Sequence, residues 1–301
     1  MEKIQDVIQK IMKTRNFRGY LYLVLSTIIY GLFGIFSRHT SEFGAFSQGA
    51  VRYAILCTFI LSLFVFKRVG WKKIERKDIR WFLTWILPAS IQPVLTFIAF
   101  THLPIGITYF LLYSTMILGG ILSGKIFFKE SFSANKLISL VLVFSGLYMI
   151  YRSDITLITS VYVLVALISG LIVGFWNTLT KKVSGNYPEL QMILLDGSST
   201  LTVSLLGLLV VHEVLPPISN LGTWIWIVGF AFSGILSSLF LIKGFKEVEA
   251  QVGSLILPME LIFASIFGFV FLGEVLMVNV YLGGLLILLA AILPTFNSSK
   301  N

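Results

Sequence analysis

An acidic residue in the middle of a long apolar run is the part of this sequence that most clearly suggests chemistry. Glu260 lies near the centre of the run over 250–272, two residues after Pro258. If the run crosses a membrane, a charge at its centre costs about 2.5–3.5 kcal/mol on insertion scales and needs a partner or a function. Glu260 is therefore a candidate ligand for a substrate amine or a candidate proton carrier. The alternative is a buried acid that hydrogen-bonds to a neighbouring helix.

The helix that carries Glu260 is expected to bend. Pro258 removes one backbone hydrogen bond, which a bilayer tolerates only where neighbouring groups or a cavity satisfy the freed partners. A weaker copy of the stretch occurs at 103–130, which aligns with 247–274 at an offset of 144 residues. In that copy Ser114 stands at the position of the proline, and its hydroxyl could bend the helix by bonding to the backbone four residues back.

Two further charges occupy equivalent positions under the same offset. Arg52 and Asp196 are 144 residues apart, and each lies inside an apolar run. Arg52 could offer a bidentate fork to a substrate carboxylate, which makes it a candidate ligand. In the alternative, each charge tethers its own helix to a loop or gate. The alternative is favoured because neither residue reaches the middle of its run and long side chains can extend to the membrane surface. An ion pair between Arg52 and Glu260 is a further alternative.

A second pair of similar segments is centred on glycines. Residues 26–40 align with 169–183 at an offset of 143, so that Gly31 corresponds to Gly174. Glycine permits close approach of membrane helices. With Pro258 and Ser114, the two glycines are expected to be places where helices bend or move.

Aromatic and amide side chains beside these glycines could form the walls of a mostly apolar cavity with a few polar contacts. Ordinary helix packing is the alternative for any one of them. An exposed ring face could also bind a cation. Together with Glu260 and Arg52, the candidate substrate-binding residues are Tyr30, Gln92, Tyr113, Trp176 and Asn177.

Composition identifies the class of protein in which these residues act. The chain has 301 residues, of which 56% are hydrophobic and only 12% are charged. A water-soluble domain of this size does not have such a composition, and the long apolar runs lack the alternation typical of outer-membrane barrels. The chain has a net charge of +9, and the basic residues that cause it lie mainly between the apolar runs. Membrane topology therefore explains the charge better than nucleic-acid binding does.

The sequence predicts an all-α integral membrane protein with ten transmembrane helices. One run, at 136–151, is near the lower limit of spanning length. A polar, basic segment at 1–18, with apolar residues at helical spacing, predicts an amphipathic helix on the membrane surface. The ten expected spans are 19–37, 44–66, 81–101, 104–124, 136–151, 156–179, 190–211, 223–242, 250–272 and 277–296.

The distribution of basic residues predicts the orientation. With the N-terminus inside, twenty of the 23 Lys and Arg residues lie in segments on the inner side, while the outer connections hold only Arg38 and Arg152. This asymmetry predicts a multi-pass protein of the cytoplasmic membrane with both termini in the cytoplasm.

The internal similarity divides the chain into two five-helix halves, at 19–152 and 156–297. Because five is odd, the second half must enter the membrane from the opposite side. The sequence therefore predicts an inverted-topology repeat, which is typical of secondary transporters. Glu130 and Glu274 are equivalent residues at helix ends, where they are expected to cap or pin the following turns.

Taken together, these features resemble the EamA family of the drug/metabolite transporter superfamily. The resemblance rests on the ten spans in two inverted halves, Gly31 beside aromatic residues, Arg52 in the second span, and Pro258 followed by Gly273-Glu274. It covers about 19–297. The first half departs from the pattern, since Ser114 replaces the proline and Lys129 replaces the glycine of the Gly-Glu pair.

The resemblance implies export of small metabolites, amino acids or drugs through a central cavity by alternating access. A channel, or an integral-membrane enzyme that acts on lipid, is the alternative function. The enzyme has little support, because the sequence contains no nucleophile–base set. It also contains no ATP-binding loop, and its one cysteine, Cys57, cannot build a metal site with others. No cofactor or metal is expected. The expected partners are a small-molecule substrate, coupled to protons if Glu260 carries them, and the lipid bilayer.

Overall fold

The computed structural model describes residues 15–103, 105–152, 161–273 and 277–296, and within these ranges it contains helices and no strands. Most of the expected surface helix at 1–18, and Glu274, lie outside the described residues. The helices are α2 (Arg15–Gly31), α3 (Phe33–His39), α4 (Ala45–Val65), α5 (Arg76–His102), α6 (Ile105–Phe128), α7 (Ala134–Tyr151), α8 (Val161–Ser184), α9 (Glu189–Val211), α10 (Leu221–Glu247), α11 (Ala250–Ile256), α12 (Met259–Leu272) and α13 (Val278–Ile292), followed by the short 3₁₀ helix η1 (Leu293–Phe296).

Eight segments of the described chain are long and apolar enough to cross a membrane. They correspond to eight of the ten expected spans. The expected third span falls in α5, which has 27 residues but begins with several charged ones and contains Pro88 and Pro93. The expected tenth span falls in α13, which is apolar but only 15 residues long. The all-helical membrane architecture is therefore confirmed, whereas the count of ten stays a prediction.

Two of the eight crossing segments are interrupted within the apolar part. The first consists of α2 and α3, which are separated at Leu32, where a backbone hydrogen bond runs to Ile29 at 3.1 Å with the tighter three-residue spacing. The second consists of α11 and α12, which are separated at Leu257 and Pro258. There the Glu260 N–H bonds to the Leu257 carbonyl at 3.0 Å, again with three-residue spacing. Glu260 therefore lies in the first turn after the break.

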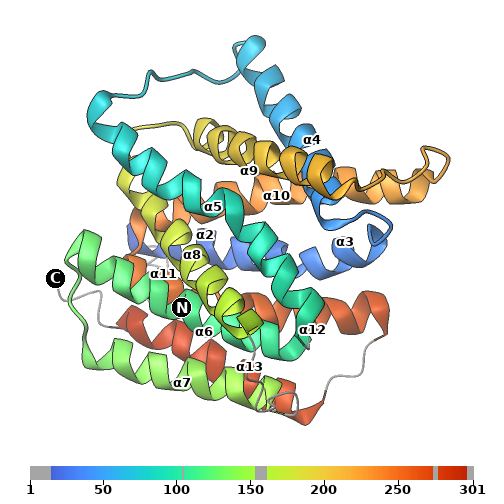
Figure 1. The fold of residues 1–301 in the computed structure, drawn as a ribbon. Helices are drawn as coiled ribbons and strands as arrows, with labels where there is room; N and C mark the ends of the chain where they lie inside the picture. Colours follow the sequence, from blue (N-terminus) through green and yellow to red (C-terminus); the bar gives the residue numbers. More distant parts are fainter. Residues whose placement is uncertain (1–14, 104, 153–160, 274–276, 297–301) are drawn as a thin grey trace, which may run out of the picture.

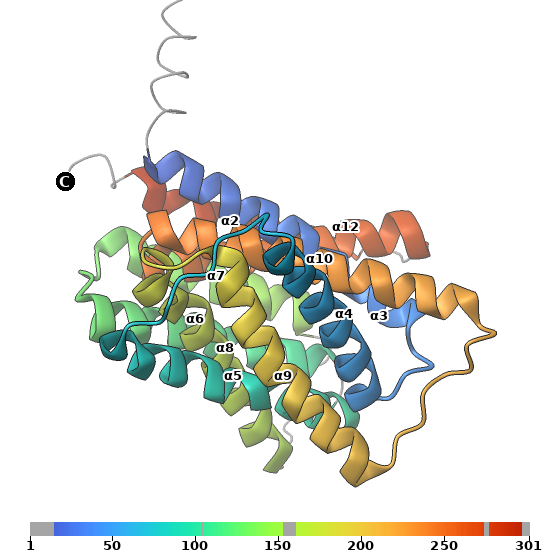
Figure 2. The same ribbon diagram turned by 90° about the horizontal axis from the view of Figure 1, so that it is seen from above.

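The helices pack in pairs that repeat between the two halves (Figure 1; Figure 2). Helix α2 packs against α10, and the equivalent helices α8 and α5 pack against each other. Helix α6 packs against α8, as α12 packs against α2. The other two close pairs, α4 with α9 and α7 with α13, join each helix to its own counterpart. The cavity described below lies among these pairs.

Gly31 and Gly174 make corresponding contacts in the two halves. A Cβ atom on Gly174 would meet the backbone of α6 at Met116, and also at Gly120, where the amide nitrogen would be 2.9 Å away. A Cβ atom on Gly31 would meet the backbone of α12 at the amide nitrogen of Ala264, also at 2.9 Å. Each glycine therefore allows a helix crossing too close for any side chain.

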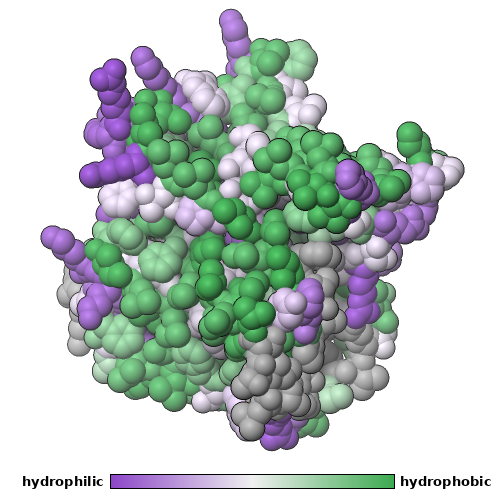
Figure 3. Space-filling view, in the orientation of Figure 1, coloured by the Kyte–Doolittle hydropathy of each residue, from purple (hydrophilic) through white to green (hydrophobic). Residues whose placement is uncertain are grey.

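The surface is apolar around the middle of the molecule, and hydrophilic side chains gather mainly toward the left and right edges of Figure 3. Large apolar side chains such as Val210, which is 77% exposed, are common on it. The turns after α4, α6 and α8 lie together at the left of Figure 1, and the turns after α3 and α9 lie at the right. The turns of the first set carry Lys67, Arg68, Lys72, Lys73 and Lys129, whereas the turns after α3 and α9 carry no Lys or Arg. We therefore call the two ends the basic side and the opposite side.

Candidate functional site

A cavity of about 410 Å³ lies between the two halves of the chain. This volume is within the range of about 300–1,000 Å³ that is typical of small-molecule sites. Helices α2 to α6, α8 to α10 and α12 contribute to its walls. All seven side chains expected to bind substrate line this one cavity, namely Tyr30, Arg52, Gln92, Tyr113, Trp176, Asn177 and Glu260.

Glu260 enters the cavity from the break between α11 and α12. Because its helix restarts at Met259, the side chain is near an interrupted backbone rather than inside a regular helix. The Tyr113 hydroxyl, on α6, is within hydrogen-bonding reach of the Glu260 carboxyl group. Tyr30 and Tyr109 line the same cavity. No Lys or Arg of the described chain lies within 4.0 Å of Glu260, so its charge is available to a bound molecule.

Arg52, on α4, is held by aromatic rings. Its guanidinium carbon lies 4.4 Å from the centre of the Phe230 ring and 4.7 Å from that of Tyr53. The ring of Phe33 is 6.0 Å away. Within the described residues no carboxylate forms an ion pair with Arg52, and the expected possibility of a pair with Glu260 is not realised. Cation–π contacts orient the guanidinium without neutralising it.

Asp196, on α9, lines the cavity instead of tethering its helix to a loop. Its Oδ1 accepts a hydrogen bond of 3.1 Å from the Trp176 indole N–H. The Trp176 backbone carbonyl in turn accepts a 3.0 Å bond from the indole of Trp85. The preferred tether interpretation was therefore wrong for Asp196, because a neighbouring indole donor on α8 allows the carboxylate to remain inside the protein.

Gln92 belongs to a polar cluster that joins α5 to α8. Its amide donates to Thr96 at 2.6 Å and to Ser169 at 3.2 Å, and the two hydroxyls are 2.7 Å apart. Ser169 corresponds to Ser26, which donates to the Ser237 carbonyl on α10 at 2.9 Å. Because Gln92 and Thr96 also line the cavity, the cluster both joins helices and offers polar atoms to a ligand.

The four residues expected to bend or move helices lie outside the cavity lining. Gly31 and Pro258 are at the two helix interruptions. Ser114 and Gly174 lie inside the continuous helices α6 and α8. The hydroxyl of Ser114 has no hydrogen-bond partner among the described residues, whereas the neighbouring Thr115 donates to the carbonyl four residues back at 3.0 Å. A functional role for these four residues stays a prediction.

A second cavity of about 360 Å³ adjoins the first and extends toward the opposite side. Its lining includes the link between α3 and α4, with Ser41, Phe43 and Gly44. The two cavities share five lining residues, namely Gln48, Arg52, Tyr53, Pro93 and Thr96. Arg52 therefore lies where the central cavity continues toward the opposite side.

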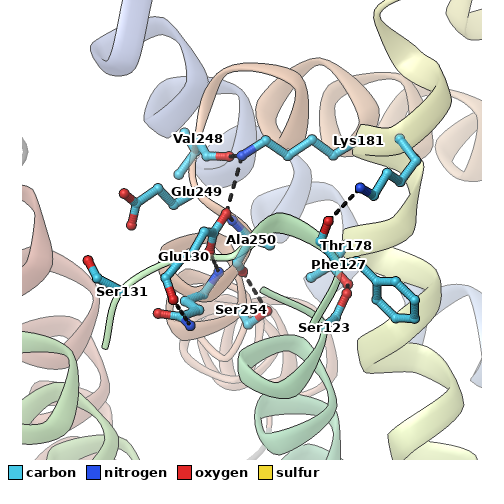
Figure 4. Close-up of polar contacts among 12 residues, drawn as sticks. Ser123, Phe127, Glu130, Ser131, Thr178, Lys181, Val248, Glu249, Ala250 and Ser254 are labelled. Atoms are coloured by element: carbon cyan, nitrogen blue, oxygen red, sulfur yellow. Dashed lines mark hydrogen bonds and ion pairs between the residues drawn. The ribbon is translucent and has the colours of Figure 1, made fainter. Parts of the chain in front are cut away.

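On the basic side, Glu130 joins the end of α6 to the start of α11 and to α8 (Figure 4). Glu130 follows α6, yet its carboxylate accepts the backbone N–H groups of Ala250 at 2.7 Å and Gln251 at 2.9 Å, which begin α11. Lys181, at the end of α8, lies 3.4 Å from the same carboxylate and donates to the Val248 carbonyl at 2.9 Å. Glu130 thus caps the half-helix α11, in addition to ending its own helix.

Close helix contacts extend this junction toward the cavity. Thr178, on α8, donates to Ser123 on α6 at 2.6 Å (Figure 4). A Cβ atom on Gly120 would collide with Ser254 of α11, and one on Gly124 would lie 2.5 Å from the Gln251 side chain. Every residue of α11 is buried. Helices α6, α8 and α11 therefore meet without space for a solute on the basic side.

The sequence analysis missed several residues that line the cavity. Gln48, Thr200 and Ser238 lie in its wall, and the ring of Tyr53 contacts the guanidinium group of Arg52. Helical spacing was the available signal for Gln48, which lies four residues, or about one turn, before Arg52. No group of three His, Cys, Asp or Glu side chains that could hold a metal occurs in the described ranges.

Comparison with known proteins agrees with this architecture. The model of the EamA-like transporter family matches twice, over residues 17–152 and 160–296. Among solved structures, one described only as "Crystal structure of protein" superposes with a TM-score of 0.81 at 11% sequence identity, covering 94% of this chain and 99% of its own, which supports the fold alone. No curated protein matches. The two family matches cover most of the sequence, one in each half, and the chain therefore belongs to the EamA-like transporter family.

Proposed function

We propose that this protein is a secondary active transporter that moves a small metabolite, such as an amino acid or a related amine, across the cytoplasmic membrane. The observation that carries the proposal is the convergence of charged, aromatic and amide side chains from both halves on one cavity. Such a mixture of apolar walls and few polar groups is typical of small-molecule sites. Because members of this family are transporters, the site is expected to bind a solute rather than to catalyse a reaction.

The difference between the two ends of the cavity supports alternating access. Toward the opposite side the cavity adjoins a second one, whereas toward the basic side Glu130 and the α6–α11 contacts close it. A channel would need a path at both ends at once. If the basic side is cytoplasmic, as the charge distribution predicts, the structure corresponds to a state open to the exterior. Release to the exterior from this state completes export.

The broken helices provide a means of changing state. The interruptions at Leu32 and at Leu257–Pro258 lie beside Gly31 and Glu260. Inverted repeats of transporters exchange their conformations when one bundle rocks against the other around a fixed site. Here α11, together with the chain around Gly31, would move relative to α6 and α8. Glu260 would couple substrate binding to this movement, because it follows the helix interruption at Leu257–Pro258.

A thermal-shift screen of purified protein tests the proposal. The compounds are amino acids, polyamines, nucleosides, sugar phosphates and quaternary ammonium salts. A ligand at about 100 times its dissociation constant adds roughly 2.7 kcal/mol to the stability of the folded state. We expect one amine-containing class to raise the melting temperature of the wild type and to have a much weaker effect on Glu260→Gln.

The control is Ser198→Ala, whose side chain is exposed on α9 and bonds only to its own helix. It should respond to ligand like the wild type. A shift that persists in Glu260→Gln would overturn the role of Glu260. Absence of a shift with every class would contradict the proposed site.

A further inference from the structure

Arg52 and Asp196 carry opposite charges at repeat-equivalent positions of packed helices, and both line the central cavity. Opposite charges in a partly buried site would be expected to pair. They do not form an ion pair with each other, nor with any other charged residue of the described chain. The separation of two complementary charges inside one small cavity requires an explanation.

Each of the two charges is held in place by aromatic side chains. The Arg52 guanidinium is held between the rings of Phe230 and Tyr53, with distances of 4.4 and 4.7 Å to the ring centres. One oxygen of Asp196 is occupied by the Trp176 indole at 3.1 Å. The remaining hydrogen-bonding capacity of the guanidinium and of the carboxylate is therefore free for a bound molecule.

The helices fix the levels from which the two charged side chains enter the cavity. Close contacts of Gly49 with Ser204, and of Gly197 with Leu56, show that α4 and α9 run antiparallel along each other. In this register Arg52 is level with residue 201, five residues from Asp196. At 1.5 Å per residue, the offset along the helix axes is about 7–8 Å. Both side chains line the same cavity from these two levels, so a small molecule with two charges of its own could contact both groups.

We propose that Arg52 and Asp196 form a charge clamp that selects zwitterionic substrates. The guanidinium binds the substrate carboxylate through its two parallel N–H groups, and the Asp196 carboxylate accepts from the substrate ammonium group. The substrate therefore carries a carboxylate and an ammonium a few bonds apart, as in an α-amino acid, with its side chain against the apolar walls. Glu260, the other carboxyl group of the cavity, adds to the attraction for the ammonium group and can also carry a proton, whereas discrimination between the amino acid and its edited derivatives rests on Arg52 and Asp196. The clamp rests on the proposed function, since it assumes that the cavity holds the substrate.

The test compares binding of chemically edited ligands. The standard amino acids are screened first by thermal shift. The amino acid with the largest shift is then compared, by isothermal titration, with its methyl ester and its N-acetyl derivative. The ester lacks the carboxylate charge, and the N-acetyl compound lacks the ammonium charge. In the wild type each edit should weaken binding by about tenfold or more, as for the loss of one charged hydrogen bond.

Two variants show which residue causes the loss of affinity on esterification and which causes the loss on N-acetylation. Arg52→Gln should bind the amino acid and its methyl ester equally, while it still discriminates against the N-acetyl compound. Asp196→Asn should show the reverse pattern, and its amide oxygen can still accept the Trp176 hydrogen bond. Ser198→Ala serves as the control, and the melting temperature of each variant without ligand reports whether it is folded.

The outcomes separate the clamp from the function on which it rests. Equal affinities for the amino acid and both derivatives in the wild type would overturn the clamp. The clamp would also be overturned if polyamines, nucleosides or another class bind while no amino acid does, and the transporter would then stand. If no solute of any class binds, the proposed function itself fails.

Discussion

At the scale of single residues, the cavity combines three charges that remain unpaired in the described structure. Arg52, Asp196 and Glu260 share one space with aromatic walls, and the hydroxyl of Tyr113 is the polar group near Glu260. An intramembrane carboxylate without a cationic partner is costly, so its retention favours a function over a packing role. The ionisable groups that share the cavity with Glu260 are Tyr30, Tyr53, Tyr109, Tyr113 and the two other charges.

The first prediction concerns proton coupling by Glu260. In liposomes that contain the wild-type protein, we expect solute uptake to increase when a pH gradient is imposed, because the carboxylate gains a proton on one side and loses it on the other. Glu260→Gln cannot carry a proton, and its uptake should not respond to the gradient. The measurement is initial uptake rate against imposed gradient. A wild-type rate that is independent of the gradient, or a variant that retains the full response, would rule out Glu260 as the carrier.

At the scale of elements, close helix crossings and two interrupted helices position the cavity. Gly174 permits α8 to approach α6, and Gly31 permits the chain between α2 and α3 to approach α12. Tyr30 and Trp176, which lie beside these glycines in the sequence, line the cavity. The capping of α11 by Glu130 determines which end of the cavity is closed.

The second prediction concerns the crossing of α8 and α6. Gly174→Ala places a methyl group against the backbone of Met116 and Gly120, which cannot move without separating the helices. Overpacking of this kind typically costs about 1–3 kcal/mol, so the melting temperature should fall. Gly34→Ala is the matched control, since a Cβ atom there meets nothing within 4 Å. An unchanged melting temperature for Gly174→Ala would show that the crossing is looser than described.

The third prediction concerns the closure on the basic side. Glu130 accepts two backbone N–H groups with its two oxygens and also contacts Lys181, whereas Gln presents an N–H₂ group to one of these donors. Glu130→Gln should therefore release the start of α11 and populate states open to the basic side. We would measure labelling of Asn177→Cys, in a Cys57→Ala background, by a membrane-impermeant maleimide applied to the basic side.

The control for this measurement is Glu75→Gln, which removes an exposed pair with Lys77. Exposed pairs contribute about 0–1 kcal/mol, and the control should label as slowly as the background. Faster labelling in Glu130→Gln alone supports control of access by the Glu130 contacts with α11. Equal labelling of both variants would mean that Glu130 stabilises the protein without controlling access.

At the scale of the whole molecule, the chain consists of two similar halves that are joined by several specific contacts on the basic side. The segment after α4 is fixed to the start of α9, where Gln191 exchanges two hydrogen bonds with the Lys72 backbone at 2.7 and 2.9 Å. The Tyr187 hydroxyl donates to Asp78 at 2.8 Å. Burial, and then the Asp78 carboxylate, raise the pKa of Tyr187, so this donor keeps its proton at neutral pH.

The repeat explains why much of the fold could be predicted from the sequence. The offsets of 143 and 144 residues predicted that Gly31 and Gly174 would be equivalent, and they make corresponding crossings. The membrane limits the possible structures to apolar helices, so that spans and halves follow from hydropathy. Pro258 likewise indicated the place where the helix is interrupted.

The contents of the cavity were less predictable because they depend on contacts between distant helices. Asp196 was interpreted as a tether, since sequence does not show that the Trp176 indole is within reach of it. Glu130 was expected at a helix end, but its capping of α11 depends on a contact across 120 residues of sequence. Hydropathy predicted ten spans. In the described chain eight helical segments are long and apolar enough to cross a membrane, because α5 begins with charged residues and α13 is short.

The measurement that tests the central claim most directly is solute counterflow in liposomes. Vesicles that contain the protein are loaded with the tightest-binding solute of the thermal-shift screen, and uptake of the same solute, radiolabelled, is followed. The account predicts uptake that saturates with concentration, overshoots equilibrium, and is lost in Arg52→Gln and Asp196→Asn but not in Ser198→Ala. Uptake that rises linearly without saturation or overshoot would indicate a channel and contradict the account.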